Sequence, residues 1–112
     1  MSKKIVIDSG HGGEDNGASG NGIIEKDLTL KISKYMKQRF DELGIPNQMT
    51  RTEDVTLNPT DRVKKVLSFY GDGKDVIVLS NHINAGGDEF TYHYIIWLGI
   101  KTAVFEWFIY IV

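Results

Sequence analysis

The 112-residue chain contains no cysteine, which excludes disulfide bonds, thiolate metal sites and cysteine nucleophiles. It carries no excess of positive charge: the formal net charge is −2, whereas a nucleic-acid-binding protein usually presents a basic face. A long apolar run near the N-terminus is also absent, because Lys4 and Asp8 enclose three apolar residues, so we expect no secretory signal peptide. The remaining composition, 41% hydrophobic and 25% charged, is typical of one globular domain.

The stretch from Ile5 to Gly13 combines a short β-branched run with a glycine-rich turn. The run predicts a buried strand, and the turn places His11 between two glycines. Glycine lets the backbone turn sharply and leaves the imidazole uncovered. In a parallel sheet this histidine would lie at the carboxyl end of its strand, where open α/β sheets hold their ligands. The alternative is a solvated turn histidine without a ligand.

The patterns along the chain predict an α/β fold with a mainly parallel sheet and flanking helices, in the order strand, helix, strand, helix, strand. The predicted strands are 5–7, 48–50 and 75–80, the helices are 25–43 and from 59 to a stop near 71–73, and 14–22 is expected to be a loop. The first helix is predicted to bury an apolar stripe made of Leu28, Ile32, Tyr35, Met36, Phe40 and Leu43.

A second histidine, His82, follows the third predicted strand, and Glu25 begins the first helix. Because parallel strands end at one edge of the sheet, we expect His11, Glu25 and His82 to lie close together. Two imidazoles and one carboxylate bind zinc with a fourth position open, and water there has its pKa lowered to about 7. The alternative is that Glu25 favours the helix dipole and both histidines are solvated.

Four segments resemble, in order, the motifs of the zinc-dependent N-acetylmuramoyl-L-alanine amidases of bacterial cell-wall lysis, the amidase type 3 family. These segments are 7–17, 24–30, 50–54 with the later Arg62, and 80–84. The resemblance covers residues 4–87 and implies that His11, Glu25 and His82 bind Zn²⁺. It also implies hydrolysis of the amide between the lactyl group of muramic acid and L-alanine in peptidoglycan, with a glutamate from a late strand as general base.

Three further polar residues are candidates for this site. Asp15 and Asn84 either orient the metal ligands or cap turns. Arg62 either contacts carboxylates of the substrate or forms a structural ion pair with Asp54 or Asp61. The residues that we predict to bind substrate are Arg62 and Asn84.

Two positions within the matched region depart from the family pattern. Ser9 stands where proline is usual, and the turn should tolerate this change. Asn47 stands where an apolar strand residue is usual, and we expect it to cost stability by burying an unpaired amide.

The resemblance ends near residue 87, and the chain changes character there. We therefore divide it into 1–87, the N-terminal part of an amidase catalytic domain that is truncated relative to the family domain, and 88–112, an aromatic tail without a family match. Eight of the twelve aromatic residues lie in the last 23 positions. A membrane span at 94–112 is one interpretation, but Lys101 and Glu106 make insertion marginal. We favour the other interpretation, a segment that was not selected for this fold.

The missing late strands have consequences for activity. Neither Glu89 nor Glu106 matches a family motif, so no general base is assigned. We expect a weakly active or inactive chain, prone to aggregate because the sheet without its late strands has an exposed strand that would pair with other chains. The alternatives are a non-catalytic peptidoglycan- or zinc-binding fragment, a membrane-anchored interaction protein, and another metal hydrolase such as a deacetylase. The resemblance implies synthesis in the cytoplasm and action at the cell wall after release, as in endolysins and other lytic enzymes.

Overall fold

The computed structural model describes residues 3–86, 89–98 and 108–111, and from residue 84 onward it describes the side chains of Tyr92, Tyr94 and Ile96. The strands are β1 (Lys4–Ser9), β2 (Ser19–Gly20), β3 (Ile23–Ile24), β4 (Asn47–Met49), β5 (Val76–Gly86), β6 (Glu89–Leu98) and β7 (Phe108–Ile111), and the helices are α1 (Glu25–Glu42) and α2 (Pro59–Tyr70). The main sheet has the strand order β4-β1-β5-β6-β7.

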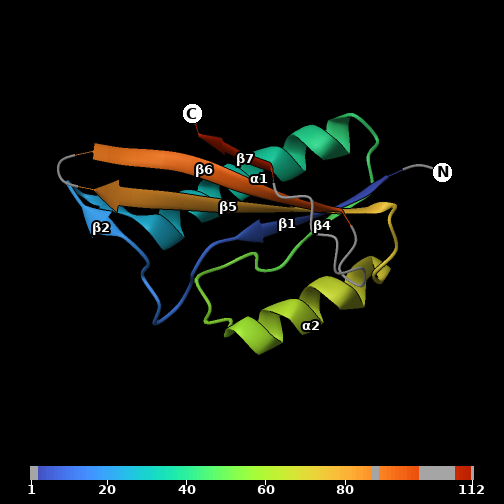
Figure 1. The fold of residues 1–112 in the computed structure, drawn as a ribbon, viewed down its shortest axis with the longest axis horizontal. Coiled ribbons are helices and arrows are strands. Elements are labelled where there is room, and N and C mark those ends of the chain that lie inside the picture. Colours follow the sequence, from blue (N-terminus) through green and yellow to red (C-terminus); the bar gives the residue numbers. More distant parts are fainter. Residues whose placement is uncertain (1–2, 87–88, 99–107, 112) are drawn as a thin grey trace.

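The predicted α/β architecture is confirmed, because β1 lies between β4 and β5 and is parallel to both. The helices α1 and α2 lie on opposite sides of this sheet (Figure 1). The third strand is longer than predicted, since β5 runs to Gly86, and β6 pairs antiparallel along most of it. The sheet was expected to lack strands beyond the third, but β6 covers the edge that β5 would otherwise expose.

Each face of the sheet has its own hydrophobic core. Side chains alternate along β1, so Ile5 and Ile7 face α1 while Val6 faces α2. On the α1 side the buried residues also include Met49 and Leu79, with Leu30, Met36 and Phe40 of the helix packed against them. On the α2 side they include Val66, Val76 and Val78. The two cores thus cover both faces of β1, and His11 follows shortly after the end of this strand.

The buried face of α1 is more polar than its apolar stripe predicts. Its buried residues are Glu25, Thr29 and Ser33, whereas Tyr35 is 70% exposed and Leu43 is 56% exposed. The prediction of a buried stripe is therefore wrong for these two residues. Thr29 Oγ1 donates to the carbonyl of Gly10, and Ser33 Oγ accepts from Ser9 Oγ, so the N-terminal half of α1 has polar partners near the end of β1. The side of α1 that carries Thr29 and Ser33 therefore faces the sheet where β1 ends.

The segment 14–22, expected to be a loop, contains half of a small hairpin. In it β2 pairs antiparallel with β3, and the turn between them is Asn21-Gly22, with φ of 49° and 77°. Asn-Gly with two positive φ angles is the favoured two-residue hairpin turn, so the signal was present in the sequence. The hairpin leads directly into Glu25, the first residue of α1.

Asn47 is buried, but the prediction that its amide is unpaired is wrong. Its Nδ2 donates to Asp41 Oδ1 at 2.7 Å and to the carbonyl of Ile45 at 2.9 Å, and its Oδ1 accepts from Lys37 Nζ at 3.2 Å. The end of α1 and the turn after it supply these partners. The cost of burying the amide is thus offset by hydrogen bonds.

Part of the aromatic tail belongs to the sheet. In β6 the side chains of Tyr94 and Ile96 pack on the α1 side of the core. In the part of the chain that the structure describes, neither helix combines the length and apolar character that a membrane crossing requires. Of the alternative span at 94–112, residues 99–107 and 112 lie outside the described residues.

Candidate metal centre

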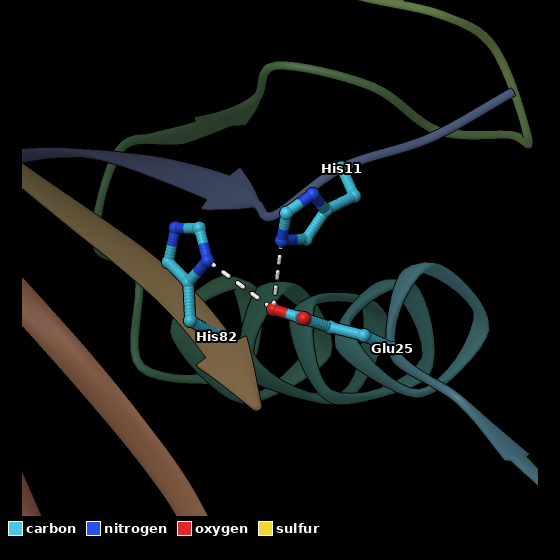
Figure 2. Close-up of side chains that lie close together, drawn as sticks. All are labelled: His11, Glu25 and His82. Carbon is cyan, nitrogen blue, oxygen red and sulfur yellow. Dashed lines mark hydrogen bonds and ion pairs between the residues drawn. The ribbon is translucent and has the colours of Figure 1, made fainter. Parts of the chain in front are cut away.

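His11, Glu25 and His82, called here the donor triad, come together at the end of β1. Figure 2 shows both imidazoles directed at one carboxylate oxygen. The distance from Glu25 Oε2 is 3.0 Å to His11 Nε2 and 3.3 Å to His82 Nδ1. One nitrogen or oxygen from each residue lies within 4.8 Å of the other two. The convergence expected from the parallel strands is thus present, although His82 lies within β5 rather than after it.

Glu25 is the buried member of the donor triad, with 4% of its side chain exposed. Its Oε1 accepts from the backbone N–H of Ala18 at 2.9 Å, and its Oε2 accepts from that of Ile83 at 2.9 Å. As the first residue of α1, it also lies at the positive end of the helix dipole. These donors hold a carboxylate charge in a site where burial alone would disfavour it.

The histidines lie partly at the surface, with 27% of the His11 side chain and 29% of the His82 side chain exposed. Their rings meet edge to face, with centroids 5.4 Å apart and an interplanar angle of 87°. Glycine makes this approach possible, since a Cβ on Gly10 would lie 2.7 Å from His82 Nδ1. His11 itself has a φ of 62°, an uncommon conformation for a residue with a side chain.

Asp15 contacts the outer side of the donor triad. His11 Nδ1 donates to Asp15 Oδ2 at 2.8 Å, and the N–H of Gly17 donates to Asp15 Oδ1 at 3.1 Å. Asp15 therefore both orients a histidine and closes a turn, which were the two roles considered for it. The hydrogen bond from His11 is the main cause that lowers the pKa of Asp15. With its proton on Nδ1, the His11 ring directs Nε2 toward Glu25.

Arg62 lies beneath the His11 loop, residues 10–13, and its ion-pair partner is Asp8, at 2.7 Å. The prediction of a pair with Asp54 or Asp61 is wrong. Its guanidinium also donates to the carbonyls of Ser9 at 2.8 Å and His11 at 3.1 Å. Asp8 is an acidic residue that the sequence reasoning missed. Asp8 is buried and accepts further hydrogen bonds from the hydroxyls of Thr50 and Ser80. The feature of the sequence that could have indicated its role is a charged residue at the end of an apolar run.

The outer side of the His11 loop is also fixed. Lys26 Nζ donates to the carbonyl of Gly13 and to Asp54 Oδ2, both at 2.8 Å, and Asp54 Oδ1 accepts from the N–H of Gly13 at 2.7 Å. The hydrogen bond from Lys26 is the main cause that lowers the pKa of Asp54. The side chain of Asn84 lies outside the described residues, so its contact with substrate, like that of Arg62, stays a prediction.

The donor set and its spacing fit a zinc ion. Zinc–nitrogen and zinc–oxygen bonds of about 2.0–2.2 Å in a tetrahedron place neighbouring ligand atoms about 3.3–3.5 Å apart. Two of the three separations here, 3.0 and 3.3 Å, are close to that value. Three protein ligands of this kind leave one position for water or substrate, which is the arrangement of a catalytic rather than a structural zinc site.

Comparison with solved structures finds the same fold. An N-acetylmuramoyl-L-alanine amidase of Nostoc punctiforme, AmiC2, superposes with a TM-score of 0.66 at 31% identity, over 78% of this chain and 47% of that one. Cwp6 from Clostridium difficile superposes with a TM-score of 0.68 at 32% identity, over 78% of this chain and 14% of that one.

The sequence comparison finds relatives that are much longer. The endolysin of Bacillus phage SPP1 is 41% identical over 99 residues, which are 85% of this chain and 35% of the endolysin. The amidase CwlM of Bacillus licheniformis is 40% identical over 86 residues, 75% of this chain and 32% of CwlM. The chain thus spans about a third of the length of these relatives.

A sequence model of one family matches residues 5–97 of the chain. The match continues past residue 87, the boundary predicted from the sequence, and takes in most of β6. It covers both helices and the parallel strands, and it contains all three members of the donor triad. The chain therefore belongs to the N-acetylmuramoyl-L-alanine amidase family.

Proposed function

We propose that this protein takes part in cell-wall lysis as a zinc-dependent amidase, which hydrolyses the bond between N-acetylmuramic acid and L-alanine in peptidoglycan. The observation that carries this proposal is the donor triad, in which two imidazole nitrogens lie within 3.3 Å of one buried carboxylate oxygen. Family membership supplies the class of bond.

His11, Glu25 and His82 would hold the metal. A zinc ion bound there supplies positive charge that polarises an amide carbonyl and makes water a nucleophile at neutral pH. The chain's own groups prepare this chemistry: Asp15 keeps the proton of His11 on Nδ1, and the N–H groups of Ala18 and Ile83 fix the two oxygens of Glu25. Because both histidine side chains are partly exposed, a substrate would approach the metal from their side.

Among the residues whose side chains the structure describes, the two acids that contact the histidines are already engaged. Glu25 belongs to the donor triad, and both oxygens of Asp15 accept hydrogen bonds, from His11 and from Gly17. We therefore assign neither as the general base that takes a proton from water. Loss of such a base reduces a rate by about 10²–10⁴-fold. We expect this chain to hydrolyse peptidoglycan weakly.

A second candidate function follows from the same observation. A chain that binds zinc without a general base would act as a zinc- or peptidoglycan-binding fragment with no turnover.

The site of action that we propose is the cell wall, reached after synthesis in the cytoplasm and release from the cell. The 41% identity to a phage endolysin supports this proposal.

The experiment incubates the zinc-loaded chain with purified peptidoglycan and identifies the soluble products by mass spectrometry. Hydrolysis of the proposed bond yields stem peptides with a free L-alanine amine and glycan strands with free lactyl carboxylates. The variant E25Q should abolish release, whereas E42Q, at the exposed far end of α1, should behave like wild type. Products cut at any other bond would refute the amidase assignment, and zinc binding without product would support the binding fragment.

A further inference from the structure

Arg51, in the segment that follows β4, is a buried arginine with 3% of its surface exposed. Its donors reach the carbonyl oxygens of Ser9, Gly10, Lys26 and Glu53 and the hydroxyl of Thr29. These acceptors are all neutral. Burial, and next the positive charge of Arg62, lower the pKa of Arg51. A buried cation in such surroundings adds little stability by itself, so its presence calls for another explanation.

Two of these hydrogen bonds connect backbone groups that are next in sequence to two members of the donor triad. Nη2 of Arg51 donates to the carbonyl of Gly10 at 2.9 Å and to the carbonyl of Lys26 at 2.9 Å. Gly10 directly precedes His11 in the chain, and Lys26 directly follows Glu25. One nitrogen atom thus fixes the backbone beside the histidine to the backbone beside the carboxylate, although β1 and α1 bring these segments from different directions.

Two neighbours brace the same contact. Thr29 Oγ1 lies 3.4 Å from Nη2 of Arg51 and donates to the carbonyl of Gly10 at 2.9 Å. Gly12 lies directly against the guanidinium, because a Cβ added to Gly12 would lie 2.9 Å from Arg51 Nε. Gly12 therefore provides room for the arginine as well as a sharp turn.

We propose that Arg51 is a positioning residue of the metal centre, which sets the spacing between His11 and Glu25 so that both bind one divalent cation. This inference rests on the proposed function in taking the donor triad as a zinc site. The planar guanidinium is suited to the role, because it presents several N–H donors in a fixed geometry. A lysine has the same charge but a single ammonium group, and it cannot reproduce the fork.

The test compares R51K with R39K on the full chain. Arg39 is an exposed arginine of α1 that pairs with Glu42, so its replacement controls for the change of residue type. Zinc affinity is measured by competition with a chromophoric chelator, and the geometry of the site is read from the visible absorption bands of bound Co²⁺. Thermal unfolding without metal reports the stability of each variant.

We expect R51K to bind zinc about 10- to 100-fold more weakly than wild type and to give altered Co²⁺ bands, as replacement of outer partners of metal ligands usually does. R39K should match wild type in both measurements. A merely structural role of Arg51 would lower the unfolding temperature and leave the Co²⁺ bands of the folded protein unchanged. Folded R51K with wild-type zinc affinity and spectrum would overturn the inference.

A second variant covers the case in which R51K does not fold. T29V keeps the arginine and the shape of the side chain but removes the hydroxyl that braces Nη2 and the Gly10 carbonyl. It should weaken zinc binding in the same direction, and wild-type zinc affinity in T29V would then overturn the inference. If wild type itself binds no zinc, the proposed function fails as well. If wild type binds zinc and the variants equal it, the positioning role alone fails.

Discussion

Replacing Gly17 by alanine tests how closely the backbone surrounds the donor triad. Gly17 has a φ of 68°, and a Cβ at this position would lie 2.6 Å from His11 Cδ2 and 2.7 Å from Glu25 Oε1. Gly22 is a matched control, because its φ is 77° and an added Cβ would meet no atom within 4 Å. Both replacements carry the cost of a left-handed backbone, about 1–2 kcal/mol, so their difference isolates the contact with the triad.

The size of the effect follows from the contact distances. Ordinary van der Waals contact for a Cβ begins at 3.4 Å, so the His11 ring must move by about 0.8 Å from the position 2.6 Å away. A functional constellation tolerates about 0.5 Å. Overpacking of this kind costs about 1–3 kcal/mol. If that cost falls on the metal-bound geometry, zinc affinity drops roughly 5- to 150-fold, since 1.4 kcal/mol corresponds to a factor of ten.

The assay is a zinc competition titration of wild type, G17A and G22A, with urea unfolding of each protein without metal. We expect G17A to lose about 5- to 150-fold in zinc affinity and G22A to stay within about twofold of wild type. Equal zinc affinities for G17A and G22A would refute the reasoning, because the added methyl group would then have been accommodated without moving either ligand.

Two further predictions concern the acids around the site. D15N should lower zinc affinity about 10- to 100-fold, because His11 loses its carboxylate partner. D75N, which changes the remote ion pair with Lys4, should leave zinc affinity unchanged. Isothermal titration calorimetry measures both affinities. The hydrogen bond from Lys26 is the main cause that lowers the pKa of Asp54 in the folded protein from its ordinary value of 3.8. Asp54 should therefore stabilise the fold fully at pH values above 3.8. This contribution should be lost as the pH falls through the lower pKa of the folded state. Urea unfolding should therefore show wild type more stable than D54N from pH 7 to 5 and the difference vanishing in stronger acid, and a pH-independent difference would contradict this.

Much of the site could be predicted from local patterns because parallel strands end at one edge. His11 and His82 follow or end apolar runs, and Glu25 begins a helix, so their convergence follows from the topology alone. The partners of the loop could not be predicted in this way. Arg62 reaches Asp8 across 54 positions, and Arg51 reaches Gly10 across 41. No periodicity indicates which of several arginines is buried, because that depends on the packed fold.

The errors along α1 have a related cause. Periodicity finds a stripe of apolar residues but does not determine how far the helix is rotated about its axis. Tyr35 is exposed because Thr29 and Ser33, on another side of the helix, face the end of β1 and hydrogen-bond there. Leu43 is exposed because it lies just past Glu42, the last residue of α1. Polar residues at the functional edge thus decide the rotation that the hydrophobic pattern leaves open.

The donor triad has one buried member and two partly exposed ones, and all three depend on the fold for their positions. The Glu25 carboxylate accepts hydrogen bonds from the N–H of Ala18, just before the hairpin, and from the N–H of Ile83 in β5. Glu25 is therefore held in place only when both segments are packed against α1. The histidines come from positions 11 and 82, which an unfolded chain does not hold at one spacing. A metal that binds only the folded chain stabilises it, by about 2.7 kcal/mol at a free concentration 100 times the Kd. Zinc binding and folding are therefore coupled through all three members of the donor triad.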